Sequence, residues 1–296
     1  MDGMINIYKE QDYTSHDVVA RLRGILKQKK IGHTGTLDPM AEGVLPVCLG
    51  KGTKLCDLLA DRSKTYETVM HLGITTDTED MTGTVLTRQE VVQTEEQVIA
   101  AVNSFVGQYE QVPPMYSAKK VNGKKLYELA RQGQVIERKP VQVEIKKITI
   151  KEIALPLVKF EVECSKGTYI RSLCRDIGEK LGCGAAMEQL LRTRVGEFHL
   201  SDAKRLSEIE QLVATGQIDS VIKPVDEAFL QYPKVVVPSS LEKKVDNGNS
   251  FFLKAVREPG DYRIYKENGM FIGIYTCQED RLWTPRKLFF VEGSND

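Results

Sequence analysis

The sequence predicts an α+β protein with a large domain over residues 1–232 and a small β-rich domain over residues 233–296. Segments with strand and helix periodicity are mixed along the first 230 residues or so. Beyond them the sequence becomes a series of short strand-like pieces separated by turn residues. At 296 residues, with 41% hydrophobic and 28% charged residues, the chain is long enough for a large core and a second, smaller one.

Strands are expected where apolar residues alternate with polar ones or form short runs. The clearest pattern places Val158, Phe160, Val162 and Cys164 on one side of a strand and charged residues on the other, which indicates one buried face. The expected strands cover residues 4–10, 64–74, 141–150 and 157–165.

Helices are expected where apolar residues recur at helical spacing after a capping signal. Thr14 with Asp17 and Thr94 with Gln97 have the spacing of a capping box. Gly182 is the stop signal of another helix. The expected helices cover residues 14–30, 94–107, 124–133 and 170–184.

Arg171 lies in the first turn of the helix expected over residues 170–184. The N-terminus of a helix is already positive, so a cation there is unfavourable unless an acid compensates it. We therefore expect Arg171 to have a carboxylate partner.

Charge is balanced overall but not locally. The chain has 41 Lys+Arg and 41 Asp+Glu, whereas residues 113–149 carry nine cations against three acids. Residues 21–30 carry five cations and no acid. Each run is either a solvated face or a surface for phosphates.

The cysteines and histidines do not predict a metal site. None of the six cysteines forms a CxxC pair, and the four histidines are scattered. No apolar run approaches the roughly 20 residues of a membrane span, and the first residues lack a signal-peptide pattern. We expect a cytoplasmic protein with reduced thiols, no metal and no contact with a membrane.

A single acid, Asp38, lies in the loop sequence GHTGTLDP between Gly32 and Pro39. It is either an ordinary turn residue or a catalytic group presented by the loop. Glycoside hydrolysis needs two carboxylates, and Glu42 could be the second. Phosphate-loop and Gly-x-Ser-x-Gly patterns are absent from the sequence. The catalytic role that remains is that of a charge-paired Asp, which acts as nucleophile or base without a cofactor.

Five motifs resemble the TruB family of bacterial tRNA pseudouridine synthases, in the family's order and between residues 8 and 198. They are GHTGTLDPMAEGVLPVCLGKGTK, KTYETVMHLGITTDTEDMTG, VPPMYSAKKVNGKKLYELARQG, CSKGTYIRSLCRDIGEKLGCGA and LLRTRVG. The resemblance implies a pseudouridine synthase fold, with a mixed, mainly antiparallel central sheet flanked by helices and loops. It also implies an RNA-gripping insertion over about residues 108–149. Residues 233–296 resemble a PUA RNA-binding domain.

The resemblance implies that the protein isomerises uridine to pseudouridine at position 55 in the T arm of tRNA. The base is flipped out, its bond to the sugar is broken, and a carbon–carbon bond replaces it, with no cofactor or metal. The implied partner is tRNA, bound at its T-arm stem-loop and, through the PUA-like domain, at its acceptor end. We expect a monomer that needs no guide RNA.

The resemblance also implies roles for individual residues. Asp38 is the catalytic nucleophile or base, Arg171 is the ion-pair partner that holds it ionised, and Tyr66 stacks on the target base near the proton that moves. Each also fits an ordinary structural role, such as a core aromatic for Tyr66. The expected RNA-binding residues are His33, which fills the gap left by the flipped base, Tyr169 and Leu190, which line the pocket, and Lys9, Lys124 and Lys125.

Two positions depart from the family pattern. Glu10 follows Lys9 where the family usually has proline, and Leu191 stands where the motif often has a first arginine before Arg192. Two other functions stay open, a guide-RNA-dependent synthase and a non-catalytic tRNA-folding or RNA-binding protein. The VPPMYSAKK segment, which looks like the bacterial insertion, argues against the guide-dependent function.

Overall fold

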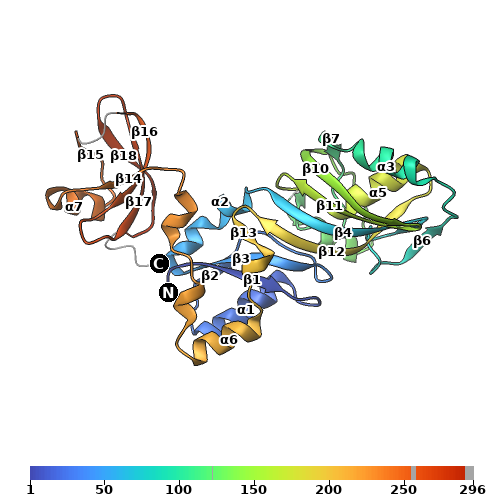
Figure 1. The fold of residues 1–296 in the computed structure, drawn as a ribbon, viewed down its shortest axis with the longest axis horizontal. Coiled ribbons are helices and arrows are strands. Elements are labelled where there is room, and N and C mark those ends of the chain that lie inside the picture. Colours follow the sequence, from blue (N-terminus) through green and yellow to red (C-terminus); the bar gives the residue numbers. More distant parts are fainter. Residues whose placement is uncertain (122, 255–257, 291–296) are drawn as a thin grey trace.

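The computed structural model describes residues 1–121, 123–254 and 258–290 of the protein (Figure 1). A long mixed sheet forms the body of the molecule, and a second sheet forms a β-rich C-terminal domain at one end. The predicted α+β class and mainly antiparallel central sheet are confirmed. Within the described ranges, no helix is long and apolar enough to cross a membrane.

The main sheet is antiparallel except where β12 runs parallel to β3. Two short strands extend it, β2 (Ile31–His33) beside β3 and β13 (Phe198–His199) beside β12. The order across the sheet is β1 (Gly3–Lys9), β3 (Glu42–Leu49), β12 (Ala185–Val195), β4 (Lys64–Leu72), β11 (Leu157–Cys164), β10 (Val141–Ala154) and β7 (Gly107–Gln111).

Strands β3 and β12 join the two halves of the sheet, and the sequence analysis did not assign either one. Strand β3 is a nearly continuous buried apolar run, and β12 mixes apolar, amide and arginine residues without regular alternation. Such runs are ambiguous from periodicity alone because buried strands and helical segments look alike. The expected strand over residues 157–165 is confirmed as β11, with its four alternating apolar residues fully buried.

Both predicted capping boxes are present, at Thr14 and at Thr94. All four predicted helices were too long, since the third covers only Leu126–Arg131 and the fourth ends at Leu181. The first ends at Leu26 because Lys27 has a left-handed backbone conformation, and the second ends at Asn103. The helices are α1 (Ser15–Leu26), α2 (Cys56–Ala60), α3 (Glu95–Asn103), α4 (Leu126–Arg131), α5 (Ile170–Leu181), α6 (Leu206–Ala214), α7 (Ser239–Asp246) and the 3₁₀ segments η1 (Gly50–Leu55), η2 (Leu200–Asp202), η3 (Ile218–Val221) and η4 (Val225–Phe229).

The helices cover two parts of the sheet. Helices α3 and α5 pack over the half formed by β4, β10, β11 and β12, where Phe160 and Leu173 are fully buried (Figure 1). Helices α1 and α6 pack over β1 and β3, around Leu22 and Ile209. The sheet therefore holds the start of α5 and the segment between β2 and β3 on one scaffold.

Part of the predicted insertion belongs to the main sheet, since β7 and β10 include residues 108–111 and 141–149. The segment between them carries a small hairpin, β8 (Lys120–Val121) with β9 (Lys124–Lys125), followed by α4. A second hairpin, β5 (Ile74–Thr76) with β6 (Val85–Arg88), projects from the end of β4.

The C-terminal sheet has its own core around the fully buried Trp283. A second cluster joins this sheet to the main domain, where Phe229, Phe271 and Phe289 pack with Met4 and Val44. The order of the sheet is β14 (Lys234–Val236), β16 (Gly260–Tyr265), β17 (Phe271–Cys277), β18 (Leu282–Leu288) and β15 (Phe251–Phe252).

Candidate active site

Asp38, in the segment between β2 and β3, forms an ion pair with Arg171 at the start of α5. Arg171 Nη2 lies 3.0 Å from Asp38 Oδ2. Arg171 Nη1 lies 3.6 Å from Oδ2 of a second carboxylate, Asp80, whose side chain is only 5% exposed. The expected carboxylate partner of Arg171 is confirmed, and Asp80, which the sequence analysis had not singled out, is an additional one. Together they compensate the cation at the positive end of the helix.

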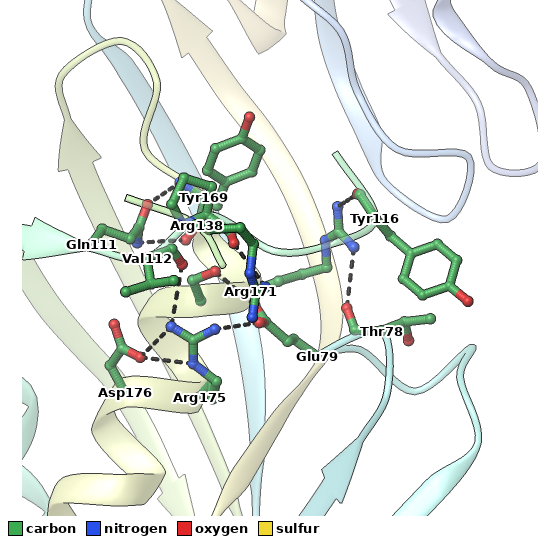
Figure 2. Close-up of polar contacts among 12 residues, drawn as sticks. Thr78, Glu79, Gln111, Val112, Tyr116, Arg138, Tyr169, Arg171, Arg175 and Asp176 are labelled. Atoms are coloured by element: carbon green, nitrogen blue, oxygen red, sulfur yellow. Dashed lines mark hydrogen bonds and ion pairs between the residues drawn. The ribbon is translucent and has the colours of Figure 1, made fainter. Parts of the chain in front are cut away.

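The same guanidinium also binds the backbone of two other segments (Figure 2). It donates to the carbonyl oxygen of Thr78 at 3.1 Å and to that of Tyr116 at 2.8 Å. Thr78 lies in the connection between β5 and β6, and Tyr116 lies in the insertion between β7 and β10. Arg171 thus links the insertion, the β5–β6 connection and the Asp38 loop.

The next turn of α5 is fixed by a second arginine, Arg175 (Figure 2). It pairs with Glu79 and with Asp176, and it donates to the carbonyl oxygen of Val112 at 3.3 Å. Ser172 Oγ donates to the same Glu79 carboxylate at 2.6 Å. These contacts attach the helix to the β5–β6 connection and to the insertion.

Tyr169 is the N-cap residue of α5, and the side chain of Gln111 holds its backbone in place. Its N–H donates to Gln111 Oε1 at 2.7 Å, and its carbonyl accepts from Gln111 Nε2 at 2.9 Å (Figure 2). The ring is left to line the adjacent pocket.

A pocket of about 450 Å³ lies where these segments meet. It is lined by Asp38, Tyr66, Tyr169, Arg171 and Leu190, so the structure brings five of the predicted site residues together. Its volume does not single it out, because another cavity, near Gly73 and Pro156, measures about 540 Å³. The charged and aromatic groups that converge on the first pocket do distinguish it.

Two further cations, Arg192 and Lys64, line this pocket although sequence reasoning gave neither a role there. Arg192 is 2% exposed and Lys64 is 7% exposed. In the sequence, each of them is a cation within a strand-like run, which is the one signal that could have pointed to the pocket. Arg192 directly follows Leu191, and Lys64 is close to Tyr66.

The two cations bind mainly backbone oxygens. Arg192 Nε donates to the carbonyl of Val44 at 2.7 Å and its Nη2 to that of Gly35 at 3.3 Å. Lys64 Nζ donates to the carbonyl of Ala60, the last residue of α2, at 2.5 Å and to that of Arg62 at 2.6 Å.

Burial shifts the titration of the pocket groups. Desolvation raises the pKa of Asp38 above its usual value, and the ion pair with Arg171 opposes this shift without cancelling it. Asp38 is therefore more basic than an ordinary carboxylate, and Arg171 favours its ionised form, as the sequence predicts for the pair. Burial likewise raises the pKa of Tyr66, which Arg192 opposes, and lowers the pKa of Lys64 to about 8.

The structure places Lys9 behind the loop rather than in the pocket. Its ammonium is fully buried and donates to the carbonyl oxygens of Glu10, Pro39 and Ala41 at 3.0, 3.1 and 2.5 Å. Lys9 thus supports the backbone that follows Asp38. Glu10, the departure from the family pattern, turns outward to pair with an arginine near α6 at 2.5 Å.

His33 also lies outside the lining of the pocket, on β2. Its ring meets that of His16 edge-on, with centroids 5.2 Å apart, and its Nδ1 accepts from the Gly35 N–H at 3.3 Å. Burial lowers the pKa of His33 to about 4, so the ring is neutral at pH 7.

Lys124 and Lys125 lie on β9 of the insertion, away from the pocket lining. Lys124 is exposed, and Lys125 donates to the Tyr127 hydroxyl at 3.3 Å. Leu191 lines a different cavity from Arg192, so a leucine there takes no cation from the pocket that contains Asp38. Among the residues that the structure describes, no three His, Cys, Asp or Glu side chains are grouped as a metal site.

Comparisons with known proteins give the family of the chain. The chain matches the family model "TruB family pseudouridylate synthase (N terminal domain)" over residues 23–170 and "tRNA pseudouridylate synthase B C-terminal domain" over residues 171–230. It is 53% identical to tRNA pseudouridine synthase B of Lachnoclostridium phytofermentans, over 98% of this chain and 100% of that one. It is 47% identical to the protein of the same name from Clostridium kluyveri, over 93% and 95% of the two chains.

Solved structures give the same fold. One is of a Cbf5-Nop10-Gar1 complex, with a TM-score of 0.72 and 27% identity over 98% of this chain and 85% of that chain. Another is of the archaeal box H/ACA sRNP Nop10-Cbf5 complex, with a TM-score of 0.70 and 25% identity over 98% and 87% of the two chains. The chain belongs to the TruB family of pseudouridylate synthases.

Proposed function

We propose that this protein is a tRNA pseudouridine synthase that isomerises the uridine at position 55, in the T arm. The enzyme class follows from family membership and from relatives named tRNA pseudouridine synthase B. The observation that carries the proposal is the ion pair of Asp38 and Arg171 at a pocket that also contains Tyr66, Tyr169 and Leu190.

The proposed chemistry needs no group from outside the chain and the RNA. The bond from N1 of uracil to C1′ of ribose breaks, the base turns, and a bond from C5 to C1′ forms. The proton on C5 leaves and N1 gains one, so product and substrate are isomers. Asp38 acts as nucleophile or base, and a carboxylate with a raised pKa suits either role.

Tyr66 and the apolar wall of the pocket hold the flipped base in this proposal. Extruding a base costs a few kcal/mol, and stacking on an aromatic ring returns about 1–3 kcal/mol. Tyr66 stacks on the base near the C5 proton, while Tyr169 and Leu190 close the pocket around it. His33, neutral at pH 7, fills the space that the base leaves in the T loop.

The remaining contacts in the proposal are with the RNA backbone. The insertion, with Lys124 exposed on its hairpin, grips the T arm, and the C-terminal domain, which we propose to be PUA-like, holds the acceptor end. Lys9 contributes through the loop that it supports. We propose that the protein acts on tRNA as a monomer in the cytoplasm.

A guide-RNA-dependent synthase is the second candidate, because the fold also matches Cbf5 from box H/ACA complexes. Identity favours the stand-alone function, at 53% to tRNA pseudouridine synthase B against 27% to Cbf5. The Asp38–Arg171 pair at the pocket argues against a purely RNA-folding protein.

The test is tritium release from a T-arm stem-loop labelled at C5 of uridine, with purified protein and no guide RNA. We expect release by the wild type, and a loss of more than about 10³-fold in Asp38→Asn with RNA binding unchanged. Asp61→Asn, at an exposed carboxylate paired with Lys166, is the control. Tight binding without release by the wild type would favour the guide-dependent or RNA-folding function, and weak binding by Asp38→Asn would make Asp38 structural.

A further inference from the structure

Gln111 lies at the point where the insertion leaves the main sheet and returns to it. It is the last residue of β7, and its Cα pairs with that of Val141, the first residue of β10. The residue is completely buried, although glutamine is mostly exposed in folded proteins. A buried side-chain amide needs hydrogen-bond partners, and Gln111 finds two of them at the start of α5.

The amide of Gln111 binds both backbone groups of Tyr169 (Figure 2). The Tyr169 N–H donates to Oε1 at 2.7 Å, and Nε2 donates to the Tyr169 carbonyl at 2.9 Å. As the N-cap residue of α5, Tyr169 has no partner for its N–H within the helix. The amide therefore holds the backbone of Tyr169 in its extended conformation, with φ −101° and ψ 113°, while the side chain lines the pocket.

The second donor hydrogen of the amide fixes the orientation of Gln111 itself. Nε2 also donates to the Tyr109 hydroxyl, on the same strand. That hydroxyl donates to Asp176 Oδ2 at 3.2 Å, and Asp176 pairs with Arg175 on the next turn of α5. A backbone N–H needs an acceptor and a carbonyl needs a donor, so only one orientation of the amide satisfies all its partners.

We infer that Gln111 is a positioning residue of the reaction, whose buried amide fixes the backbone of Tyr169 and thereby the place of its ring in the pocket. The inference rests on the proposed function and adds a residue to it. Arg171 lies two residues after Tyr169, and its guanidinium binds the insertion again at the carbonyl of Tyr116. The insertion and the start of α5 are therefore joined on both sides of the pocket-lining tyrosine.

The test is a double-mutant cycle in single-turnover tritium release from the T-arm stem-loop at saturating protein. It compares wild type, Gln111→Met, Tyr169→Ala and the double variant, because methionine has about the size of glutamine but lacks the amide. We expect Gln111→Met to slow the wild type by at least about tenfold, and the Tyr169→Ala variant by a factor at least about fivefold smaller, since the ring is already gone. Equal factors in the two backgrounds would overturn the inference.

The rate and the affinity should separate in Gln111→Met. We expect the affinity for the stem-loop to stay within about threefold of that of the wild type, because contacts with the phosphate backbone supply most of it. A loss of affinity with an unchanged rate at saturation would overturn the inference.

Gln93→Met is the matched control. The amide of Gln93 also binds the backbone of α5, but at the other end of the helix, where Nε2 donates to the Leu181 carbonyl at 3.0 Å. Gln93 does not line the pocket. We expect its substitution to have a small effect on the rate, equal in the wild-type and Tyr169→Ala backgrounds. A coupling with Tyr169→Ala as large as that of Gln111→Met would remove the specific role of Gln111.

A second measurement uses the wild type without any substitution. We expect the Tyr169 N–H to exchange with solvent at least about a hundredfold more slowly than an amide of an unstructured peptide, because Gln111 accepts its hydrogen bond. Exchange at the unstructured rate would overturn the inference whether or not Gln111→Met folds. This readout does not need turnover, so an inactive wild type would contradict the proposed function while the contact between Gln111 and Tyr169 is still tested.

Discussion

The pocket is lined by two buried arginines, Arg171 and Arg192, and we call the part of the lining around each one its wall. The two guanidinium charges are stabilised by different kinds of partner. In the Arg171 wall, two carboxylates lie within ion-pair distance of the guanidinium. In the Arg192 wall, two backbone carbonyls take that place, and within the described part of the chain no carboxylate pairs with Arg192. Burial accordingly lowers the pKa of Arg192 below its usual value.

The difference separates two tasks. The Arg171 wall is built from loops and the start of a helix, where the guanidinium joins a carbonyl of the insertion to the carboxylate of Asp38. The Arg192 wall is built from the sheet, where backbone dipoles fix a cation without neutralising it. Lys64, which lines the same pocket, adds a second cation to that wall.

We expect the largest difference between the two walls in the free energy of unfolding that each arginine contributes. Arg171→Met leaves Asp80 buried without its cation, so we expect a loss of about 3–5 kcal/mol in the free energy of unfolding. Arg192→Met leaves carbonyl acceptors without a donor, and we expect a loss of about 1–3 kcal/mol. Urea unfolding at pH 7 measures both, with Arg194→Met as a partly exposed control. A larger loss for Arg192→Met would reverse the comparison.

Lys64, in the Arg192 wall, should make the free energy of unfolding depend on pH. Lys64 has a pKa of about 8 when folded, against a usual value near 10.5. Between these values the unfolded chain holds a proton that the folded protein has released, so the free energy of unfolding rises with pH across this window. The contribution is present above pH 10.5 and is lost as the pH falls to 8. The shift corresponds to roughly 3 kcal/mol.

Lys64→Met should remove this contribution. We expect the difference in unfolding free energy between wild type and variant to change by that amount from about pH 7.5 to about pH 10.5, measured by urea unfolding at each pH. Lys166→Met is the control, because Lys166 is an exposed lysine that pairs with Asp61. A pH-independent difference would mean that Lys64 titrates normally.

The smallest effect is expected outside both walls, on the insertion that Arg171 holds. Charge reversal at Lys124 and Lys125 should weaken binding of a T-arm stem-loop and lower the slope of log affinity against log salt by about 0.7–0.9 for each phosphate that is no longer neutralised. Lys243 and Lys244, exposed on α7 of the C-terminal domain, are the matched pair for the control. An unchanged slope in the Lys124/Lys125 variant would exclude these lysines from the RNA-binding surface.

Local features were predictable from the sequence. The capping boxes at Thr14 and Thr94, the alternating strand that contains Phe160 and the β-rich C-terminal region all appear in the structure. They depend on residues within a few positions of one another, where propensity and periodicity act. The need of Arg171 for an acid was predictable for the same reason, since it follows from its place in one helical turn.

The partners were decided by the tertiary structure. Asp80 completes the Arg171 wall from a hairpin connection far earlier in the chain, and Arg192 reaches Gly35 because β12 pairs with β3 in parallel. The sequence also suggested that Lys9 would meet RNA, whereas the fold surrounds it with carbonyls. The sequence by itself determined which residues carry charge and where helices begin. Only the assembly of the sheet decided which charged side chains are buried and which groups they contact, because burial and pairing depend on segments far apart in the chain.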